Sequence, residues 1–165
     1  MQTAASQESE SQFLTFMLAG EEYGVDILKV QELRGWENVT PIPNTPSYVR
    51  GVINLRGIVI PIVDLRDRFG LEVVQPGPTT VVIILKLESK AGKERVMGIV
   101  TDAVSEVYTL GQSELRPPPD MEGSATIDFV KDLATIDDKM VILLDIGRLV
   151  HEGILGEKAE PALAE

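Results

Sequence analysis

Cysteine is absent from the 165 residues, and histidine occurs only once, at His151. Without thiols there can be no disulfide, no thiolate nucleophile and no Cys-ligated metal. His151 lies near the end of a predicted C-terminal helix, where an exposed or capping histidine is the ordinary case. The P-loop spacing, the G-x-G-x-x-G fingerprint and the G-x-S-x-G motif are also missing. We therefore predict no catalytic residue, no metal site and no cofactor.

Paired carboxylates are the remaining candidates for acid–base chemistry or for a hard cation. Asp64 and Asp67 form one such pair, and Asp137 and Asp138 form another. Asp64 has a sufficient role as the N-cap of a short helix, and Asp137 and Asp138 fall where a hairpin turn is expected. Neither pair indicates an enzyme.

Basic runs and long apolar stretches are missing as well. The formal net charge is −11, and no cluster of Lys and Arg is available to displace counterions from phosphates. The apolar run at residues 58–63 is about a third of the roughly 20 residues that span a bilayer. The first residues lack the basic start and the apolar region of a signal peptide. We expect a cytoplasmic protein that binds no nucleic acid and does not insert into a membrane.

Aromatic residues make up only 5% of the chain, so Val, Ile and Leu must build the core. These residues occur in short runs separated by Gly, Pro, Asn and Asp, a pattern typical of small β-barrels or a β-sandwich. The predicted strands are residues 13–18, 22–27, 50–55, 58–63, 80–87, 95–100 and 139–144.

Helical signals are brief and occur at residues 27–33, 44–49, 64–70 and 145–153. In the second of these segments, Asn44 or Thr45 would cap a helix that begins at Pro46. The third and fourth segments begin with aspartate and end with glycine, as short capped helices do. The apolar spacing in the first segment fits a helix, although the start of a strand fits as well.

An internal repeat organises the chain. Residues 24–33 resemble residues 98–107, and residues 48–65 align without gaps on residues 129–146. The identities are few, but the apolar pattern and the order strand, turn, strand, aspartate agree. Two local similarities in the same order favour a duplicated β unit over a chance likeness of aliphatic strands.

Duplication predicts two small barrels about a pseudo-twofold axis, within one domain at residues 13–156. The repeat units would span about residues 13–75 and 80–150, with strands exchanged between the barrels as a further option. Residues 1–12 and 157–165 would be flexible tails. A seam between the two barrels would be a favourable place for a partner to bind.

One arginine stands out in the most aliphatic segment, "GVINLRGIVIPIVDL". Arg56 belongs to a predicted hairpin tip, "NLRG", whose counterpart in the second repeat is "TIDD". Ordinary turn chemistry could account for it. Arginine on a rigid tip is also a common interface anchor, and the nearby Gly51 permits close backbone approach. Glu32 is a second candidate, although a solvated acidic face would explain it equally well.

These motifs, together with "GEEYGVDILKVQELRG" and "MVILLDIGRLV", resemble the CheW-like domain family from about residue 13 to residue 151. The resemblance implies a mainly β fold of two intertwined five-stranded SH3-like β-barrels with a few short helices. It implies a non-enzymatic adaptor that couples the cytoplasmic tips of methyl-accepting chemoreceptors to the regulatory domain of the histidine kinase CheA. Other CheW-like domains of the receptor array would be further partners.

The resemblance also assigns surfaces. It implies a receptor-binding groove between the barrels formed by Ile27, Val30, Glu32, Leu33 and Val107. It implies coupling to receptor, kinase or both for Arg50, Gly51, Arg56 and Gly57. The predicted kinase-facing residues are Val39, Ile42 and Pro43.

Two alternatives stay open. The same family supplies adaptors of pilus-linked and other chemosensory arrays, and this sequence does not separate the pathways. A small-ligand-binding or hydrolytic β-barrel would need convergent polar groups in a pocket, and the residue inventory indicates none.

Overall fold

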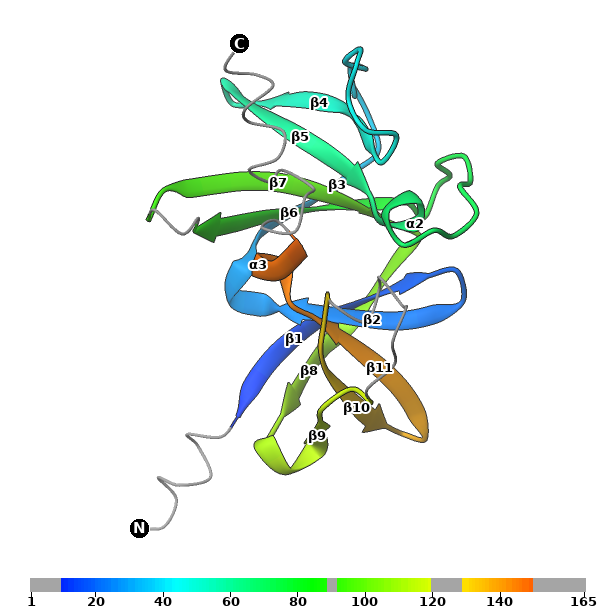
Figure 1. Ribbon diagram of the computed structural model, residues 1–165, viewed down its shortest axis with the longest axis vertical. Helices are drawn as coiled ribbons and strands as arrows, with labels where there is room; N and C mark the ends of the chain where they lie inside the picture. Colours follow the sequence, from blue (N-terminus) through cyan, green and yellow to red (C-terminus); the bar gives the residue numbers. More distant parts are fainter. Residues whose placement is uncertain (1–9, 89–91, 120–128, 150–165) are drawn as a thin grey trace.

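The computed structural model describes residues 10–88, 92–119 and 129–149, which form two packed β-sheets (Figure 1). One sheet has six strands in the order β8-β1-β2-β11-β10-β9, and the other has five in the order β3-β6-β7-β5-β4. The first sheet comprises β1 (Ser11–Leu18), β2 (Glu21–Asp26), β8 (Ala103–Leu110), β9 (Leu115–Arg116), β10 (Val130–Ile136) and β11 (Lys139–Leu144). The second comprises β3 (Val30–Gly35), β4 (Val49–Leu55), β5 (Ile58–Asp64), β6 (Val81–Glu88) and β7 (Glu94–Thr101).

Short helices connect the strands: η1 (Ile27–Lys29), α2 (Leu65–Arg68), η2 (Gln112–Glu114) and α3 (Ile146–Leu149). In the part of the chain that the structure describes, none of the helices has the length and apolar character needed to cross a membrane.

The two sheets repeat one arrangement. Apart from the two-residue β9, the order β8-β1-β2-β11-β10 corresponds to β3-β6-β7-β5-β4, with a parallel pair in the middle of each. Gly24 lies opposite Leu143 in one parallel pair, and Gly98 lies opposite Ile62 in the other. A Cβ atom on either glycine would come within 2.8 Å of the facing side chain. The two aligned glycines therefore have the same role, because each lets two parallel strands pack closely.

Strands cross between the sheets at equivalent points. β3 follows β2 along the chain but joins the other sheet, and β8 follows β7 but returns to the first sheet. Each sheet is thus built from strands of both halves of the chain, which ties the two barrels together (Figure 1).

The described residues form three apolar clusters. One draws on both sheets and packs between them, with Phe16, Val25, Ile83 and Ile99 at its centre. The other two belong to single sheets: the inner cluster of the five-stranded sheet is Ile53, Leu55, Ile60, Ile62, Val82 and Ile84, and that of the six-stranded sheet is Phe13, Leu110, Ala134, Val141 and Leu143. The intersheet cluster joins the barrels into one body, because both sheets bury side chains in it.

The two predicted aspartate-capped helices begin as expected. The Asp64 carboxylate accepts hydrogen bonds from the backbone N–H groups of Arg66 and Asp67, and α2 is followed by Gly70 with a positive φ of 78°. The Asp145 carboxylate likewise accepts from the N–H of Arg148 at the start of α3. The remainder of that predicted segment, His151 and residues 157–165 lie outside the described residues.

One helix prediction was wrong, and a second segment follows its strand alternative. Residues 44–48 form turns that lead into β4 at Val49, with the Val49 N–H donating to the Pro46 carbonyl at 2.9 Å, because Thr40 already pairs with β4 and the chain must reverse. Residues 27–33 contain only the turn η1 before β3 begins, so the strand alternative holds. The predicted tail at residues 1–12 was too long, since β1 begins at Ser11.

Candidate docking interface

The β4–β5 hairpin tip places Arg56 and Gly57 at positive φ, 51° and 88°. This is the geometry of a two-residue type I′ turn. The equivalent tip between β10 and β11 uses Asp137 and Asp138, with φ of 50° and 68°. Since the second tip forms the same kind of turn with two aspartates, the fold does not require arginine at this place.

Arg56 reaches across to Glu32 on β3. Its Nη2 donates to Oε1 of Glu32 at 2.6 Å, and Nη1 of Arg34 donates to the other carboxylate oxygen at 3.4 Å. The hydrogen bond from Arg56 is the main cause that lowers the pKa of Glu32. The two polar residues singled out from the sequence therefore form one ion pair, between strands at opposite ends of the five-stranded order.

The predicted groove residues on β3 divide between its two faces. Val30 and Leu33 lie opposite Leu85 and Ile83, which belong to the intersheet cluster. A register shift between Val30 and Glu32 puts both aliphatic residues on this face, while Glu32 points toward the other. Glu32 is therefore separated from the apolar groove residues and belongs with Arg56.

An equivalent aliphatic residue lies on the edge strand β8. Val107 lies opposite Leu14 of the intersheet cluster, and the repeat aligns Val107 with Leu33. Leu33 and Val107 are 45% and 46% exposed, respectively, although each shares a face with buried residues. Ile27 of η1 is half-buried against the same cluster. The seam thus presents exposed aliphatic side chains at matching places on two edge strands.

Arg50 and Gly51 have structural roles in addition to any role in docking. Arg50 donates from Nε and Nη2 to Oδ2 of the buried Asp64, at 3.0 and 2.9 Å. Gly51 has a φ of 148°, and a Cβ atom there would overlap the carbonyl of Thr40. The backbones of Thr40 and Val52 exchange two hydrogen bonds of 2.9 Å, which hold the chain that close.

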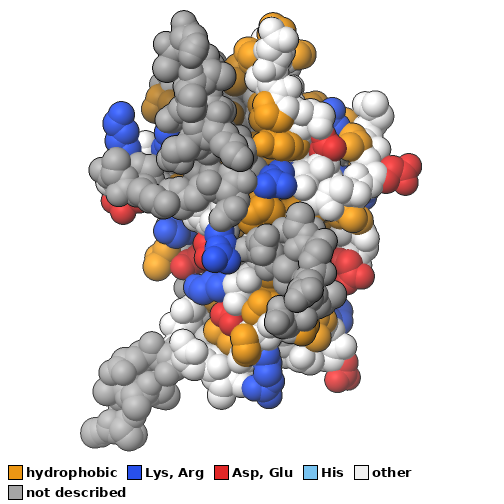
Figure 2. Space-filling model, viewed as in Figure 1, with side chains coloured by type: hydrophobic (Ala, Val, Ile, Leu, Met, Phe, Trp, Pro, Cys, Tyr) orange, Lys and Arg blue, Asp and Glu red, His pale blue; other side chains and the backbone are white. Residues whose placement is uncertain are grey.

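The predicted kinase-facing residues lie on the segment between β3 and β4. Ile42 and Pro43 are exposed, whereas Val39 is half-buried against the inner cluster of the five-stranded sheet. Figure 2 shows hydrophobic side chains gathered at the top of the molecule, where this segment and β4 lie in Figure 1. The exposed Ile58 and Val59 follow the Arg56 tip on β5.

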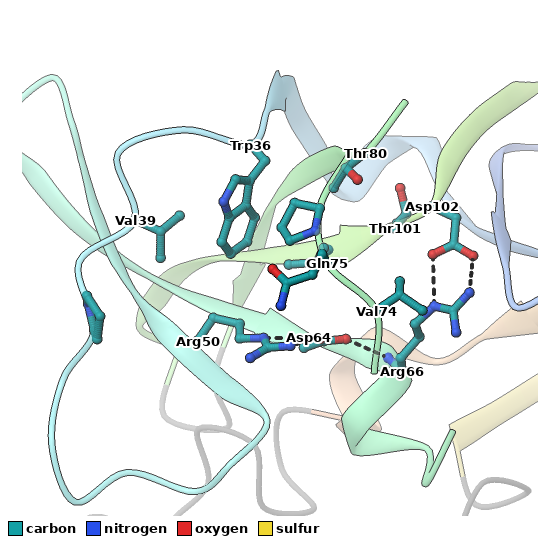
Figure 3. Close-up of a pocket in the computed structure, with 13 residues that line it drawn as sticks. Trp36, Val39, Arg50, Asp64, Arg66, Val74, Gln75, Thr80, Thr101 and Asp102 are labelled. Carbon is teal, nitrogen blue, oxygen red and sulfur yellow. Dashed lines mark hydrogen bonds and ion pairs between the residues drawn. The ribbon is translucent and has the colours of Figure 1, made fainter. Parts of the chain in front are cut away.

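A pocket of about 240 Å³ opens beside this surface (Figure 3). It brings Val39 and Arg50 together with residues that sequence reasoning did not select. The lining residues are Trp36, Val39, Pro41, Arg50, Asp64, Arg66, Val74, Gln75, Pro76, Thr80, Val100, Thr101 and Asp102.

Arg66 and Asp102 form the most closely bonded pair in this pocket. Nε and Nη2 of Arg66 donate to the two oxygens of Asp102 at 3.0 and 2.8 Å. The Ala19 N–H also donates to Asp102, at 2.8 Å. Hydrogen bonding to Arg66 holds the pKa of Asp102 below its usual range, and the same contact raises the pKa of Arg66. The pair connects α2, the β7–β8 crossover and the β1–β2 turn.

Nothing in this arrangement resembles a metal centre. Across residues 10–88, 92–119 and 129–149, no group of three or more His, Cys, Asp and Glu side chains could hold an ion. The geometry offers contact surfaces and a polar pocket beside β4.

The model of the CheW-like domain family matches residues 12–153. The chain belongs to the CheW-like family. It is 42% identical over 146 residues to the chemotaxis protein CheW of Klebsiella aerogenes, covering 88% of this chain and 85% of that protein. It is 36% identical over 135 residues to the CheW of Rhizobium meliloti, covering 82% and 84% of the two chains.

A solved structure has the same fold. The crystal structure of the scaffolding protein TtCheW from Thermoanaerobacter tengcongensis superposes with a TM-score of 0.72 at 37% identity, covering 81% of this chain and 88% of that one. The predicted mainly β fold is confirmed. The family and its named members identify this CheW-like chain as a scaffold protein of chemotaxis.

Proposed function

We propose that the chain couples the cytoplasmic tips of chemoreceptors to the regulatory domain of the histidine kinase CheA, and that it catalyses no reaction itself. It would act in the cytoplasm, recruited to membrane-associated receptor arrays, where other CheW-like domains are further partners. The observation that carries this proposal is the presence of two separate apolar surfaces on one rigid body.

The seam surface suits a helical receptor tip. Leu33 and Val107 offer aliphatic contacts at equivalent places on β3 and β8, with Ile27 and Val30 packed behind. An amphipathic helix lays an apolar stripe against such a surface, and a few anchors supply most of the affinity.

The second surface suits the kinase. The exposed Ile42, Pro43, Ile58 and Val59 lie on the segment before β4 and on the β4–β5 hairpin. Both the segment and the hairpin are fixed, since Thr40 pairs with Val52 and Arg56 pairs with Glu32. A fixed apolar surface loses little conformational entropy on binding, which favours docking of another folded domain.

Simultaneous binding is the direct consequence of two separate surfaces. We would immobilise a receptor tip fragment, saturate it with the chain, and then add the kinase regulatory domain while recording mass on the surface. The proposal expects a second mass increase that depends on the chain. Displacement of the chain from the receptor by the kinase domain would mean that the partners compete for one surface, and the proposal would fail.

Pilus-linked and other chemosensory arrays would use the same two surfaces. Capture of partners from the source cell with the wild-type chain would identify the receptors, and so the pathway.

A further inference from the structure

The pocket beside β4 has polar walls, and its acceptor groups are already engaged. Asp64 accepts from the Arg50 side chain through Oδ2 and from the Arg66 N–H through Oδ1. Asp102 accepts from Arg66 through both oxygens and from Ala19 through Oδ2. These carboxylates are bound internally, so they have little capacity left for a cationic ligand.

The donors of the same pocket are only partly used. All three side-chain nitrogens of Arg66 already donate to a partner, because Nη1 donates to the Glu72 carbonyl at 2.7 Å and the other two donate to Asp102. Arg50 uses Nε and Nη2, whereas its Nη1 has no hydrogen-bond partner among the described residues. The indole N–H of Trp36 also has no hydrogen-bond partner among the described residues. Figure 3 shows Trp36 and Arg50 on either side of Gln75. The remaining hydrogen-bonding capacity therefore favours an acceptor.

The pocket also has an apolar rim. Val39, Val74 and Val100 line it, and Val74 is 46% exposed. Val73 is exposed next to Val74 but does not line the pocket. Such a rim would pack the methylene groups of an extended acidic side chain while its carboxylate meets the guanidinium.

We propose that this pocket accepts a carboxylate, carried by an acidic side chain of the kinase regulatory domain, and that Arg50 binds it while keeping its bonds to Asp64. The part of this proposal that names the kinase regulatory domain as the partner rests on the proposed function. The exposed apolar residues around the rim favour a side chain of a docked protein over a free metabolite, because a protein would cover them.

Trp36 is the only tryptophan in the chain, so its indole N–H gives a single resonance that reports on this pocket. Glutarate would be titrated into the chain alone, with sodium chloride at matched ionic strength as the control. We expect a saturable shift of that resonance with glutarate and none with chloride. Equal responses to the two salts would overturn the proposal, whatever the chain's partners are.

Val74→Glu would place a carboxylate at the pocket rim. That carboxylate would either occupy the proposed site itself or repel an incoming carboxylate. Val73→Glu is the matched control, with the same charge one residue away and also on an exposed position. We expect Val74→Glu to abolish the glutarate shift and to weaken binding of the kinase regulatory domain by about tenfold, with Val73→Glu near wild type.

The source of the carboxylate follows from the same pair of variants. If glutarate binds and Val74→Glu removes that binding without changing affinity for the kinase domain, the pocket takes a free carboxylate and the kinase domain is not its partner. Arg50→Gln gives an independent check on the ligand. It should lose the glutarate shift while keeping a folded amide spectrum, and an unchanged shift in this variant would exclude Arg50 as the binding group.

Discussion

Arg56 and Glu32 form an ion pair that joins the tip of the β4–β5 hairpin to the edge strand β3, with 2.6 Å between Nη2 and Oε1. β3 and β4 stand at opposite ends of the five-stranded order. The pair therefore fixes the hairpin relative to the strand that also carries Leu33, and it lies between the two proposed docking surfaces.

Arg56→Glu should leave the fold intact and weaken assembly of the receptor–kinase complex. The Arg56 side chain is largely exposed and the turn is of a kind that acidic residues also form, so little of the core depends on it. The substitution places a second carboxylate beside Glu32, which frees the hairpin tip. Circular dichroism would report the fold, and co-sedimentation with receptor fragment and kinase would report assembly.

The double variant Glu32→Arg with Arg56→Glu separates two explanations. If the ion pair matters because it positions the hairpin, reversing both charges should restore much of the assembly. If Arg56 itself contacts a partner, the double variant should stay as weak as the single one. Wild-type assembly by the Arg56→Glu chain would exclude both explanations.

Leu33→Lys and Val107→Lys should each lower receptor affinity by about tenfold, because each places a charge at an exposed aliphatic anchor of the seam. Binding of the kinase regulatory domain should be unchanged. Met140→Lys is a suitable control, since Met140 is exposed on the β10–β11 hairpin, away from the proposed groove residues. Isothermal titration with a receptor tip fragment would measure the affinities. Equal receptor affinities for the wild-type chain and all three variants would show that the seam does not bind the receptor.

Gly51→Ala should destabilise the protein strongly, by about 3 kcal/mol or more in the free energy of unfolding. The new Cβ would overlap the Thr40 carbonyl, and the φ of 148° is strained for any other residue. Gly57→Ala is the matched control, because its φ is positive but the space around it is open. That change should cost only about 1–2 kcal/mol. Urea unfolding would compare the free energies of unfolding of the two variants. Equal losses of stability would contradict a steric role for Gly51.

Asp102→Asn should lower the free energy of unfolding at pH 7 by about 1–2 kcal/mol, since Asp102 loses its charge opposite Arg66. The folded pKa of Asp102 lies below its ordinary value of 3.8. Its ion pair therefore stabilises the protein fully above that value and is lost as the pH falls through the folded pKa.

The difference in stability between wild type and Asp102→Asn should consequently narrow as the pH falls below about 4. Urea unfolding of both proteins across this range would measure it, and other carboxylates cancel in the comparison. A difference that stays constant with pH would show that Asp102 acts through its shape and not through its charge.

The sequence predicts much of the fold because apolar runs and turn residues mark most strands, and the repeat relates the two sheets. β8 was not among the predicted strands, because its central residues Ser105, Glu106 and Val107 are exposed and give no apolar run. The false helix at residues 44–49 had a good cap and a proline start. Pairing of Thr40 with β4, a contact between distant residues, overrode those local signals.

The candidate site was only partly predictable for the same reason. Arg56 and Glu32 were singled out separately, and nothing in their spacing indicated that they meet. The register shift in β3 that puts Val30 and Leu33 on one face, with Glu32 on the other, is likewise invisible in a single sequence. Arg66 and Asp102 are 36 residues apart, and the pocket they line arises only when α2 packs near the β7–β8 crossover.

Co-sedimentation of kinase with receptor, with and without the chain, measures the proposed coupling itself. Receptor cytoplasmic fragments in vesicles would be mixed with histidine kinase, and the pelleted kinase and its autophosphorylation would be measured. We expect the chain to bring the kinase into the pellet and to raise its activity, whereas the Leu33→Lys chain should do neither. Equal amounts of pelleted kinase with and without the wild-type chain would contradict the coupling role.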